Sequence, residues 1–260
     1  MSNTSLETLF RPLPISLCVL CLNEEDNLPR ALAQASQFAE VLVLDTGSSD
    51  CSIKLAKELG ATVAQSEWLG FAKTRRKHFE MAREPWILWL DADEEVTPQL
   101  VAELRRLFEK ENIDDHAAYE VNREMVFLGK RIRHGDWFPD RVVRLFKADR
   151  WSMPEREVHE SLKISGSVGR LQSLVPHYSY CSWRDREERV ESYSSLWAKQ
   201  QFATGRRSGS LAAWLRAGWK LIRGLFLKKG FLDGWLGVRI AWSNAAEVYR
   251  KYQKLHQLGR

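Results

Sequence analysis

The feature that most constrains this chain is the stretch from Trp86 to Glu95, an apolar run that ends in acidic residues. Five consecutive apolar residues, 86–90, favour a short strand buried on both faces of a sheet. Asp91 and Asp93 follow where such a strand leaves the core, and two unpaired carboxylates would be costly to bury there. A divalent cation, Mg²⁺ or Mn²⁺, would remove that cost, because hard cations prefer carboxylate and phosphate oxygens. The alternative is that Asp93 only begins the turn into a helix starting near Pro98.

Strands and helices are predicted to alternate through the first half of the chain. Apolar runs at 15–22, 41–44 and 61–64 predict further strands, and amphipathic segments between them predict helices. Alternation with short connections is typical of a mostly parallel sheet with helices on both faces. Ligands bind such sheets outside the carboxyl ends of the strands.

Polar residues follow three of these strands. Asn23 and Glu24 come after the first strand, Asp45 after the second, and Asp91 with Asp93 after the run at 86–90. Because the carboxyl ends of parallel strands meet at one edge of the sheet, we expect these side chains to converge on a site. Taken singly, Asp45 could be a turn residue and Glu24 a solvated one.

Charge is divided unevenly along the chain. Of the 260 residues, 44% are hydrophobic and 28% charged, which is ordinary for a soluble globular protein. Residues 184–260 carry 16 basic and six acidic residues, a net charge of +10, whereas residues 1–183 carry 23 and 28, a net charge of −5. This division points to an anionic partner, either a membrane surface, nucleic acid or an acidic acceptor. We expect no signal peptide and no membrane-spanning segment.

Cys18 and Cys21 have the spacing of some metal and redox motifs, but they lie in the first predicted strand. Their side chains would point to opposite faces of the sheet, so we interpret them as core residues. This cysteine usage suggests a reducing compartment.

The sequence divides into an N-terminal lead-in, 1–14, an α/β domain, 15–183, and a basic helical region, 184–260. In the helical region, apolar residues recur at helical spacing and basic residues fall on the opposite face. The apolar positions are Leu211, Trp214, Leu215, Gly218, Leu221, Ile222 and Leu225, and the basic ones are Arg216, Lys220 and Arg223. Such a helix suits a surface of anionic lipid, lying flat on it. The alternative is a helix that packs its apolar face on the α/β domain.

Three motifs, in order, resemble those of a known family. They are Leu-Cys-Leu-Asn-Glu-Glu at 20–25, Val-Leu-Asp-Thr-Gly-Ser-Ser-Asp at 43–50 and Leu-Asp-Ala-Asp-Glu at 90–94. Together they resemble the inverting glycosyltransferases of family two, which have the GT-A fold, and the resemblance covers residues 15–180. The whole chain looks most like the bacterial lipopolysaccharide core glycosyltransferases that add β-linked glucose to inner-core heptose. The runs 138–160 and 229–252 carry this narrower resemblance.

The resemblance implies roles for individual residues. In that family the Asp matching Asp45 contacts the nucleotide base, and the aspartates matching Asp91 and Asp93 lie at the sugar-nucleotide diphosphate and its metal. A similar segment at 70–75 places Arg75 near the diphosphate. The nucleotide-sugar site is accordingly expected to include Leu22, Asn23, Glu24, Asp45, Arg75, Asp91 and Ala92. The divalent cation is expected at Asp91, Asp93 and His159.

Inverting sugar transfer needs a general base for the acceptor hydroxyl and an electrophile for the leaving diphosphate. The resemblance places Val158-His159-Glu160 near the base position, and we interpret Glu160 as the base and His159 as a metal or phosphate contact. These two side chains alternate if the segment is extended, so one of them would face the site. The competing carboxylates are Asp136, Asp140, Glu155 and Glu157. Arg141 and Arg144 could bind diphosphate or pair with carboxylates.

The sequence therefore predicts a metal-dependent inverting glycosyltransferase that moves glucose from UDP-glucose, or another UDP-hexose, to a lipopolysaccharide inner-core acceptor. Its partners would be the nucleotide sugar, an anionic glycolipid and the inner face of a bacterial cytoplasmic membrane, where the protein would be cytoplasmic and peripheral. Another bacterial glycan or lipid-linked acceptor is the alternative. A nucleotidyltransferase would need a glycine-rich basic loop where this chain has the acidic loop 23–26. A basic membrane- or nucleic-acid-binding protein is the non-enzymatic alternative, although no nucleic-acid-binding motif is present and no nucleic acid is expected as a partner.

Overall fold

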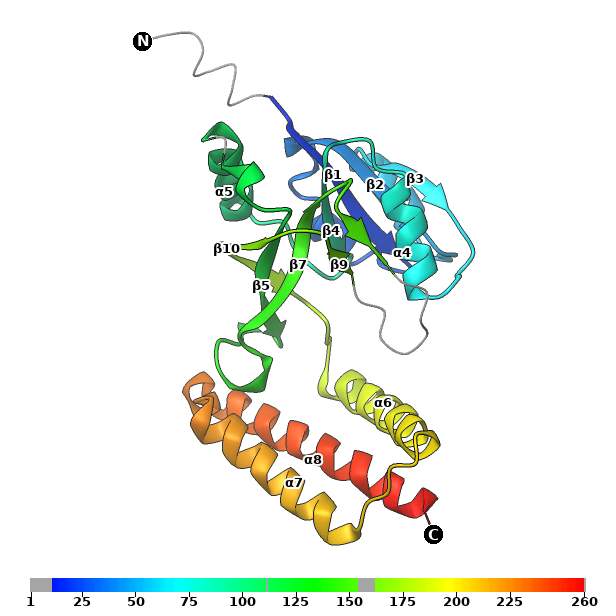
Figure 1. Ribbon diagram of the computed structural model, residues 1–260, viewed down its shortest axis with the longest axis vertical. Coiled ribbons are helices and arrows are strands. Elements are labelled where there is room, and N and C mark those ends of the chain that lie inside the picture. Colours follow the sequence, from blue (N-terminus) through cyan, green and yellow to red (C-terminus); the bar gives the residue numbers. More distant parts are fainter. Residues whose placement is uncertain (1–10, 111, 154–161, 260) are drawn as a thin grey trace. The chain divides into compact units, whose positions relative to one another are not determined.

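The computed structural model describes residues 11–110, 112–153 and 162–259 (Figure 1). The chain forms two compact units. The first, the α/β unit, comprises Met1–Arg123 and Arg141–His177. The second, the helical unit, comprises Glu124–Asp140 and Tyr178–Arg260. The helical unit is therefore built from two stretches that lie far apart in the sequence.

A mostly parallel sheet forms the centre of the α/β unit. Its strands are arranged in the order β10-β5-β7-β4-β1-β2-β3. The pairings β1–β2, β1–β4 and β2–β3 are parallel, and β7 pairs antiparallel with β4. The strands are β1 (Leu13–Cys21), β2 (Phe38–Asp45), β3 (Thr62–Gln65), β4 (Trp86–Asp91), β5 (Ala118–Phe127), β7 (Asp140–Lys147) and β10 (Val168–His177). The short strands are β6 (Lys130–Arg131), β8 (Trp151–Ser152) and β9 (Lys163–Ile164).

Helices cover both faces of this sheet, as the sequence predicted for a GT-A fold (Figure 1). They are α2 (Leu28–Ala31), α3 (Ser52–Glu58), α4 (Phe71–Glu80) and α5 (Pro98–Glu109). Thr97 caps α5 by accepting a hydrogen bond from the backbone N–H of Leu100, and Pro98 takes the first helical turn, where no backbone donor is needed. The predicted mostly parallel sheet with flanking helices is confirmed.

Alternate residues of the buried strands belong to two separate apolar cores. Leu17 and Leu88 pack with α2, α3 and α5, while Ile87 packs with α4 on the other face. Cys18 and Cys21 follow the same alternation, since each is fully buried and they fall in different cores. Both thiols are free, and burial raises their pKa, so the interpretation of these cysteines as core residues is confirmed.

A buried histidine joins α4 to the sheet. His78 is 1% exposed, and its Nε2 lies 3.1 Å from the carbonyl oxygen of Leu42 in β2. Burial lowers the pKa of His78 to about 4, and the hydrogen bond to Leu42 offsets only part of that effect. The imidazole is therefore neutral at pH 7 and donates Nε2–H to the strand.

Three long helices make up most of the helical unit. They are α6 (Trp183–Ala203), α7 (Ser210–Ile222) and α8 (Gly234–Leu258), and the π-helical turn η4 (Arg223–Leu227) and the 3₁₀ turn η5 (Gly230–Asp233) connect α7 to α8 (Figure 1). Phe127, Ile132, Leu236 and Ile240 form the buried core of this unit. Arg186 of α6 is buried as well, and it donates to Asn244 and Glu247 of α8. Among the helices that the structure describes, none combines the length and apolar character needed to cross a bilayer.

Asp136 ties the first stretch of the helical unit to the turn after α7. Its carboxylate is 5% exposed and lies 3.1 Å from Lys220 Nζ, 2.7 Å from Arg223 Nη2 and 3.6 Å from Lys228 Nζ. Burial would raise the pKa of Asp136, but Arg223 and Lys220 outweigh burial and lower it. Two of the three basic residues that the sequence placed on the polar face of α7 therefore neutralise an internal carboxylate.

Glycines allow the turn after α7 to approach α8 closely. A Cβ on Gly237 would lie 1.9 Å from the carbonyl oxygen of Gly230, a distance at which backbone must move. A Cβ on Gly218, in the middle of α7, would meet nothing within 4 Å. The two positions therefore differ sharply in their need for glycine.

We expect Gly237→Ala to lower the free energy of unfolding by about 1–3 kcal/mol, because the added methyl group overpacks the contact with Gly230. Gly218→Ala is the matched control, and it should be neutral or stabilising by up to about 1 kcal/mol, since alanine favours the helix. Chemical denaturation followed by circular dichroism measures both values. Equal effects of the two substitutions would contradict the close approach.

His78 predicts an acid-sensitive stability. The pKa of His78 is depressed in the native chain, so its contribution to the free energy of unfolding is fully present above its usual pKa of 6.5. That contribution is lost as the pH falls toward 4, because the unfolded chain binds a proton there more readily than the native chain does. The loss should amount to about 3 kcal/mol over that range. Denaturation midpoints measured between pH 7 and pH 4 should fall less steeply for His78→Gln, and parallel curves for the two proteins would contradict the assignment.

Candidate active site

The carboxyl ends of β2, β1 and β4 lie side by side at one edge of the sheet. Cys21 at the end of β1 is paired with Asp45 of β2, and Leu20 is paired with Asp91 of β4. Asp45 and Asp91 therefore flank the end of β1 on its two sides. The predicted convergence of polar residues from three strand ends is confirmed by this register.

The loops that follow β1 and β2 are bonded to one another. The backbone N–H of Asn23 donates to Ser48 Oγ at 2.8 Å, and the backbone N–H of Ser49 donates to Asn23 Oδ1 at 2.8 Å. The backbone N–H of Glu24 donates to Ser52 Oγ at 2.8 Å. Asn23 has a φ of +55°, in the left-handed region that asparagine tolerates better than most residues. The polar residues after β1 therefore support the neighbouring loop.

Asp45 holds its own turn together. Its side chain is 1% exposed, and Oδ1 accepts hydrogen bonds from the backbone N–H groups of Gly47 at 3.0 Å and Ser48 at 3.1 Å. Gly47 has a φ of +115°, which glycine adopts readily. This is the turn role that the sequence left open for Asp45. Leu22, in the adjoining loop after β1, is half exposed.

Asp91 lies between two arginines. Its Oδ1 accepts from Arg75 Nη2 at 3.2 Å, and its Oδ2 accepts from Arg144 Nη2 at 2.7 Å. Both guanidinium groups also lie over the ring of Trp89, with their central carbons 4.3 Å (Arg75) and 4.4 Å (Arg144) from its centroid. Such cation–π contacts favour a fixed position for each arginine. Arg75, which the sequence placed near the diphosphate, therefore lies against Asp91.

Glu94 is the second acid of this cluster. It is 1% exposed, and its Oε1 accepts from Arg144 and, at 3.0 Å, from Arg123 Nη1. Its Oε2 accepts from the backbone N–H of Asp91 at 3.3 Å. Three guanidinium groups and two carboxylates thus meet at the end of β4. We call these five residues, Arg75, Asp91, Glu94, Arg123 and Arg144, the arginine cluster.

Opposite charges outweigh desolvation at Asp91 and Arg144. Burial alone would raise the pKa of Asp91, but Arg144 and Arg75 lower it below its usual value. Burial alone would lower the pKa of Arg144, but Glu94 and Asp91 raise it. For Arg75, burial prevails over Asp91 and its pKa is lowered. Asp91 is therefore ionised at pH 7.

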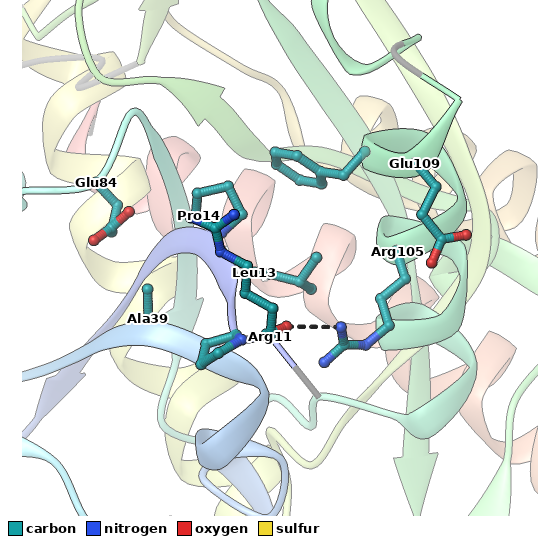
Figure 2. Close-up of a pocket in the computed structure, with 9 residues that line it drawn as sticks. Arg11, Leu13, Pro14, Ala39, Glu84, Arg105 and Glu109 are labelled. Carbon is teal, nitrogen blue, oxygen red and sulfur yellow. Dashed lines mark hydrogen bonds between the residues drawn. The ribbon is translucent and has the colours of Figure 1, made fainter. Parts of the chain in front are cut away.

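A hollow of about 370 Å³ opens beside the arginine cluster, lined by Arg75, Trp89, Asp91, Arg123 and Arg144 together with apolar residues. A different hollow, of about 560 Å³, lies at the other end of β1, where Leu13 begins the strand and Arg105 Nη1 donates to the carbonyl oxygen of Arg11 (Figure 2). Parallel sheets bind ligands at the carboxyl ends of their strands, so the hollow beside the arginine cluster is the candidate active site.

Asp93 is paired with a histidine from another strand. His177 Nε2 lies 3.3 Å from Asp93 Oδ2, and both side chains are largely buried. The end of β10 is held there because the backbone N–H of Glu95 donates to the carbonyl oxygen of Pro176 at 3.0 Å. His177 Nδ1 is buried and has no hydrogen-bond partner in the described part of the chain. Ala92, between the two aspartates, is buried.

The residues present fit a cation bound through one carboxylate. Both oxygens of Asp91 accept from arginines, so among the described residues we take Asp93, with His177 beside it, as the candidate ligand. Within residues 11–110, 112–153 and 162–259, no group of three or more His, Cys, Asp or Glu side chains forms a metal site. Mg²⁺ is commonly held by one or two carboxylates and substrate phosphates, so Asp93 together with a bound diphosphate meets that requirement.

The remaining candidates of the sequence analysis have different positions. His159 and Glu160 lie outside the described residues, as do the competing acids Glu155 and Glu157. Asp136 belongs to the helical unit, where it forms ion pairs with three basic side chains. Glu94, Arg123 and His177 were missed by the sequence analysis. The sequence could have indicated Glu94, because it is an acidic residue three positions after Asp91 at the end of the same predicted strand.

The family model described as "Glycosyl transferase family 2" matches residues 16–161. The chain belongs to glycosyl transferase family 2. The match covers the four parallel strands and the arginine cluster, and membership of this family indicates a glycosyltransferase that uses a nucleotide sugar.

Several curated relatives of this family 2 protein align over most of its length. An uncharacterized glycosyltransferase of Rickettsia typhi is 26% identical over 254 residues, which cover 94% of this chain and 87% of the relative. The lipopolysaccharide core biosynthesis glycosyltransferase LpsC of Rhizobium meliloti is 26% identical over 261 residues, covering 92% and 93%. Among solved structures, S. aureus TarS 1–349 is 15% identical with a TM-score of 0.44, covering 95% of this chain and 92% of that chain.

We expect Glu94→Gln to destabilise the protein by about 3–5 kcal/mol, because it removes one of the two carboxylates that compensate the buried charge of Arg144. Glu58→Gln removes an exposed ion pair with Lys54 and serves as the matched control, with an expected change of under about 1 kcal/mol. Thermal and chemical denaturation give both values. A Glu94→Gln variant as stable as Glu58→Gln would show that the cluster does not depend on this carboxylate.

Proposed function

We propose that this family 2 protein moves a hexose from a UDP-hexose, with glucose as the expected sugar, and inverts the anomeric configuration. The observation that carries the proposal is the arginine cluster at the carboxyl end of β4, because the guanidinium groups of Arg75, Arg123 and Arg144 line an open hollow there. Negative charge grows on the leaving diphosphate as the sugar departs. Fixed guanidinium groups can stabilise that charge without reorganising.

The nucleotide-sugar site is proposed to include the loops after β1 and β2, with Leu22, Asn23, Glu24 and Asp45, and the end of β4 with Asp91 and Ala92. The hydrogen bonds between the two loops favour a fixed surface for the nucleoside. Arg75 would face the diphosphate, because α4 holds it against Asp91 and Trp89. A fixed surface lowers the entropy cost of binding the donor.

A divalent cation is proposed to join the donor diphosphate to Asp93, with His177 beside it. When bound, the cation would supply further charge neutralisation for the leaving group. Asp91 would contribute indirectly, since its carboxylate positions Arg75 and Arg144. His159 was expected as a further ligand, and His177 is the histidine whose placement supports the proposal.

Glu160 remains the proposed general base for the acceptor hydroxyl. A carboxylate acts in this role when it lies within hydrogen-bond reach of that hydroxyl on the face opposite the leaving group. Glu160→Gln should then abolish transfer while donor binding is retained.

The acceptor is proposed to be an anionic glycolipid, the inner core of lipopolysaccharide, at the inner face of a bacterial cytoplasmic membrane. The similarity to LpsC along 92% of this chain supports that choice. The net charge of +10 in residues 184–260 suits an anionic acceptor surface. The protein would work there as a cytoplasmic, peripheral enzyme.

Calorimetry with UDP-glucose, with and without Mn²⁺, tests the reaction class. We expect binding that strengthens with Mn²⁺ and is weakened about tenfold or more in Asp93→Ala, whose lost carboxylate removes the proposed cation ligand. Asp149→Ala, at an exposed aspartate of the same unit, is the matched control and should bind as the native chain does. If UDP-glucose binds equally well without Mn²⁺ and in Asp93→Ala, the cation has no part in the proposal. If no nucleotide sugar binds, the proposed sugar transfer is overturned.

A further inference from the structure

The hairpin formed by α7, η4, η5 and α8 carries an unusual number of exposed apolar side chains. Along α7 and η4, Leu211, Leu215, Trp219, Ile222 and Phe226 recur at intervals of three or four residues, and each is at least half exposed. They therefore form one stripe on a helix face that no described residue covers. Soluble monomeric proteins rarely leave contiguous apolar surface of this extent in water.

A second apolar stripe runs along the start of α8. Trp235 and Trp242 are 59% and 66% exposed, and Val238 lies between them at helical spacing. At the tip of the hairpin, Phe231 and Leu232 of η5 are exposed as well. The buried side of α7 uses small residues instead, so the predicted apolar face of this helix largely points to solvent.

An apolar groove of about 270 Å³ lies between α7 and α8, the helices that carry the two stripes. Trp214 of α7 and Trp242 of α8 both line it, and the ring of Tyr249 packs at a tilt against Trp214 with ring centroids 4.5 Å apart. Its floor contains the small residues Gly218 and Ala246. The stripes and the groove together form one apolar surface, which we call the hairpin face.

Positive charge surrounds the hairpin face. Residues 206–232 contain seven basic residues and no acidic one. Lys220, Arg223 and Lys228 face Asp136, but Arg216 and Lys229 are exposed, and neither is in an ion pair within the part of the chain that the structure describes. Asp233, the acid at the end of η5, is largely buried against His134, so the exposed charges of this segment are basic.

We propose that the hairpin face inserts into the surface of a bilayer that contains anionic lipid, with α7 and the start of α8 lying flat in the interface. Tryptophan favours the boundary between headgroups and acyl chains, and exposed basic side chains beside it attract anionic headgroups. A second copy of the chain fits this face less well, because it would bring like charges together. The inference deepens the proposed function, on which it rests for the location of the acceptor.

Vesicle sedimentation with the full chain tests the proposal. We expect the native protein to bind phosphatidylcholine vesicles containing phosphatidylglycerol at least about tenfold more tightly than vesicles of phosphatidylcholine alone, and to lose most of that preference at high salt. Equal binding to both vesicles, or none to either, would overturn the proposal.

Substitutions locate the surface that binds. Leu215→Glu and Trp219→Ser, both at exposed positions, should each reduce binding to the anionic vesicles about tenfold or more. Leu196→Glu is the matched control, because Leu196 is 53% exposed on α6, in the same unit, and the substitution changes charge as Leu215→Glu does. It should bind within about twofold of the native chain. Circular dichroism establishes that the variants are folded.

Two outcomes separate this inference from the proposed function. Vesicle binding that depends on Leu215 in a protein that binds no nucleotide sugar would support the hairpin face and contradict sugar transfer. The opposite outcome is a protein that binds UDP-glucose but whose vesicle binding is the same in Leu215→Glu, Trp219→Ser and Leu196→Glu. That outcome would support sugar transfer and overturn the hairpin face. Light scattering provides the remaining test, since a native dimer that Leu215→Glu dissociates, without any vesicle binding, would assign the face to a second copy.

Discussion

The contact on which the α/β unit most depends is the buried guanidinium group of Arg144 between Asp91 and Glu94. Arg144 is 3% exposed, so water does not solvate its charge and the carboxylates of Asp91 and Glu94 must compensate it. The need to compensate these charges fixes β7 beside β4 and holds the chain after Asp91 in a turn that brings Glu94 back to the strand end. Trp89 completes the arrangement, because its ring packs against two guanidinium groups. The shape of the candidate active site follows from this balance.

The sequence predicted the parallel strands and their helices well, because each buried strand is a continuous apolar run with a turn at its end. It also placed Asp45 and Asp91 at one edge, since the carboxyl ends of parallel strands meet at the same edge of a sheet. The partners of these acids were harder to foresee. His177 and Arg123 reach the strand ends from β10 and β5, which are far away in sequence, and no spacing rule links them to Asp91 or Asp93.

In the helical region, the sequence did not predict which face of a helix is buried. Apolar residues at helical spacing predict that a helix has an apolar face, but the same pattern describes a face that packs and a face that stays exposed. In α7 the buried positions are Ala213 and Ala217, while Leu215 points outward. Similarly, Arg223 matched the pattern of a solvated polar face, yet it binds the buried Asp136. Which side of an amphipathic helix is covered depends on neighbours that a single helix does not encode.

The helical unit also draws on residues 124–140, which leave and re-enter the α/β unit between β5 and β7. Phe127 and Ile132 from that excursion share their core with Leu236 and Ile240 of α8. No single cut of the backbone can therefore release the helical unit intact. Recombination between family members would have to exchange both segments at once to keep this core matched.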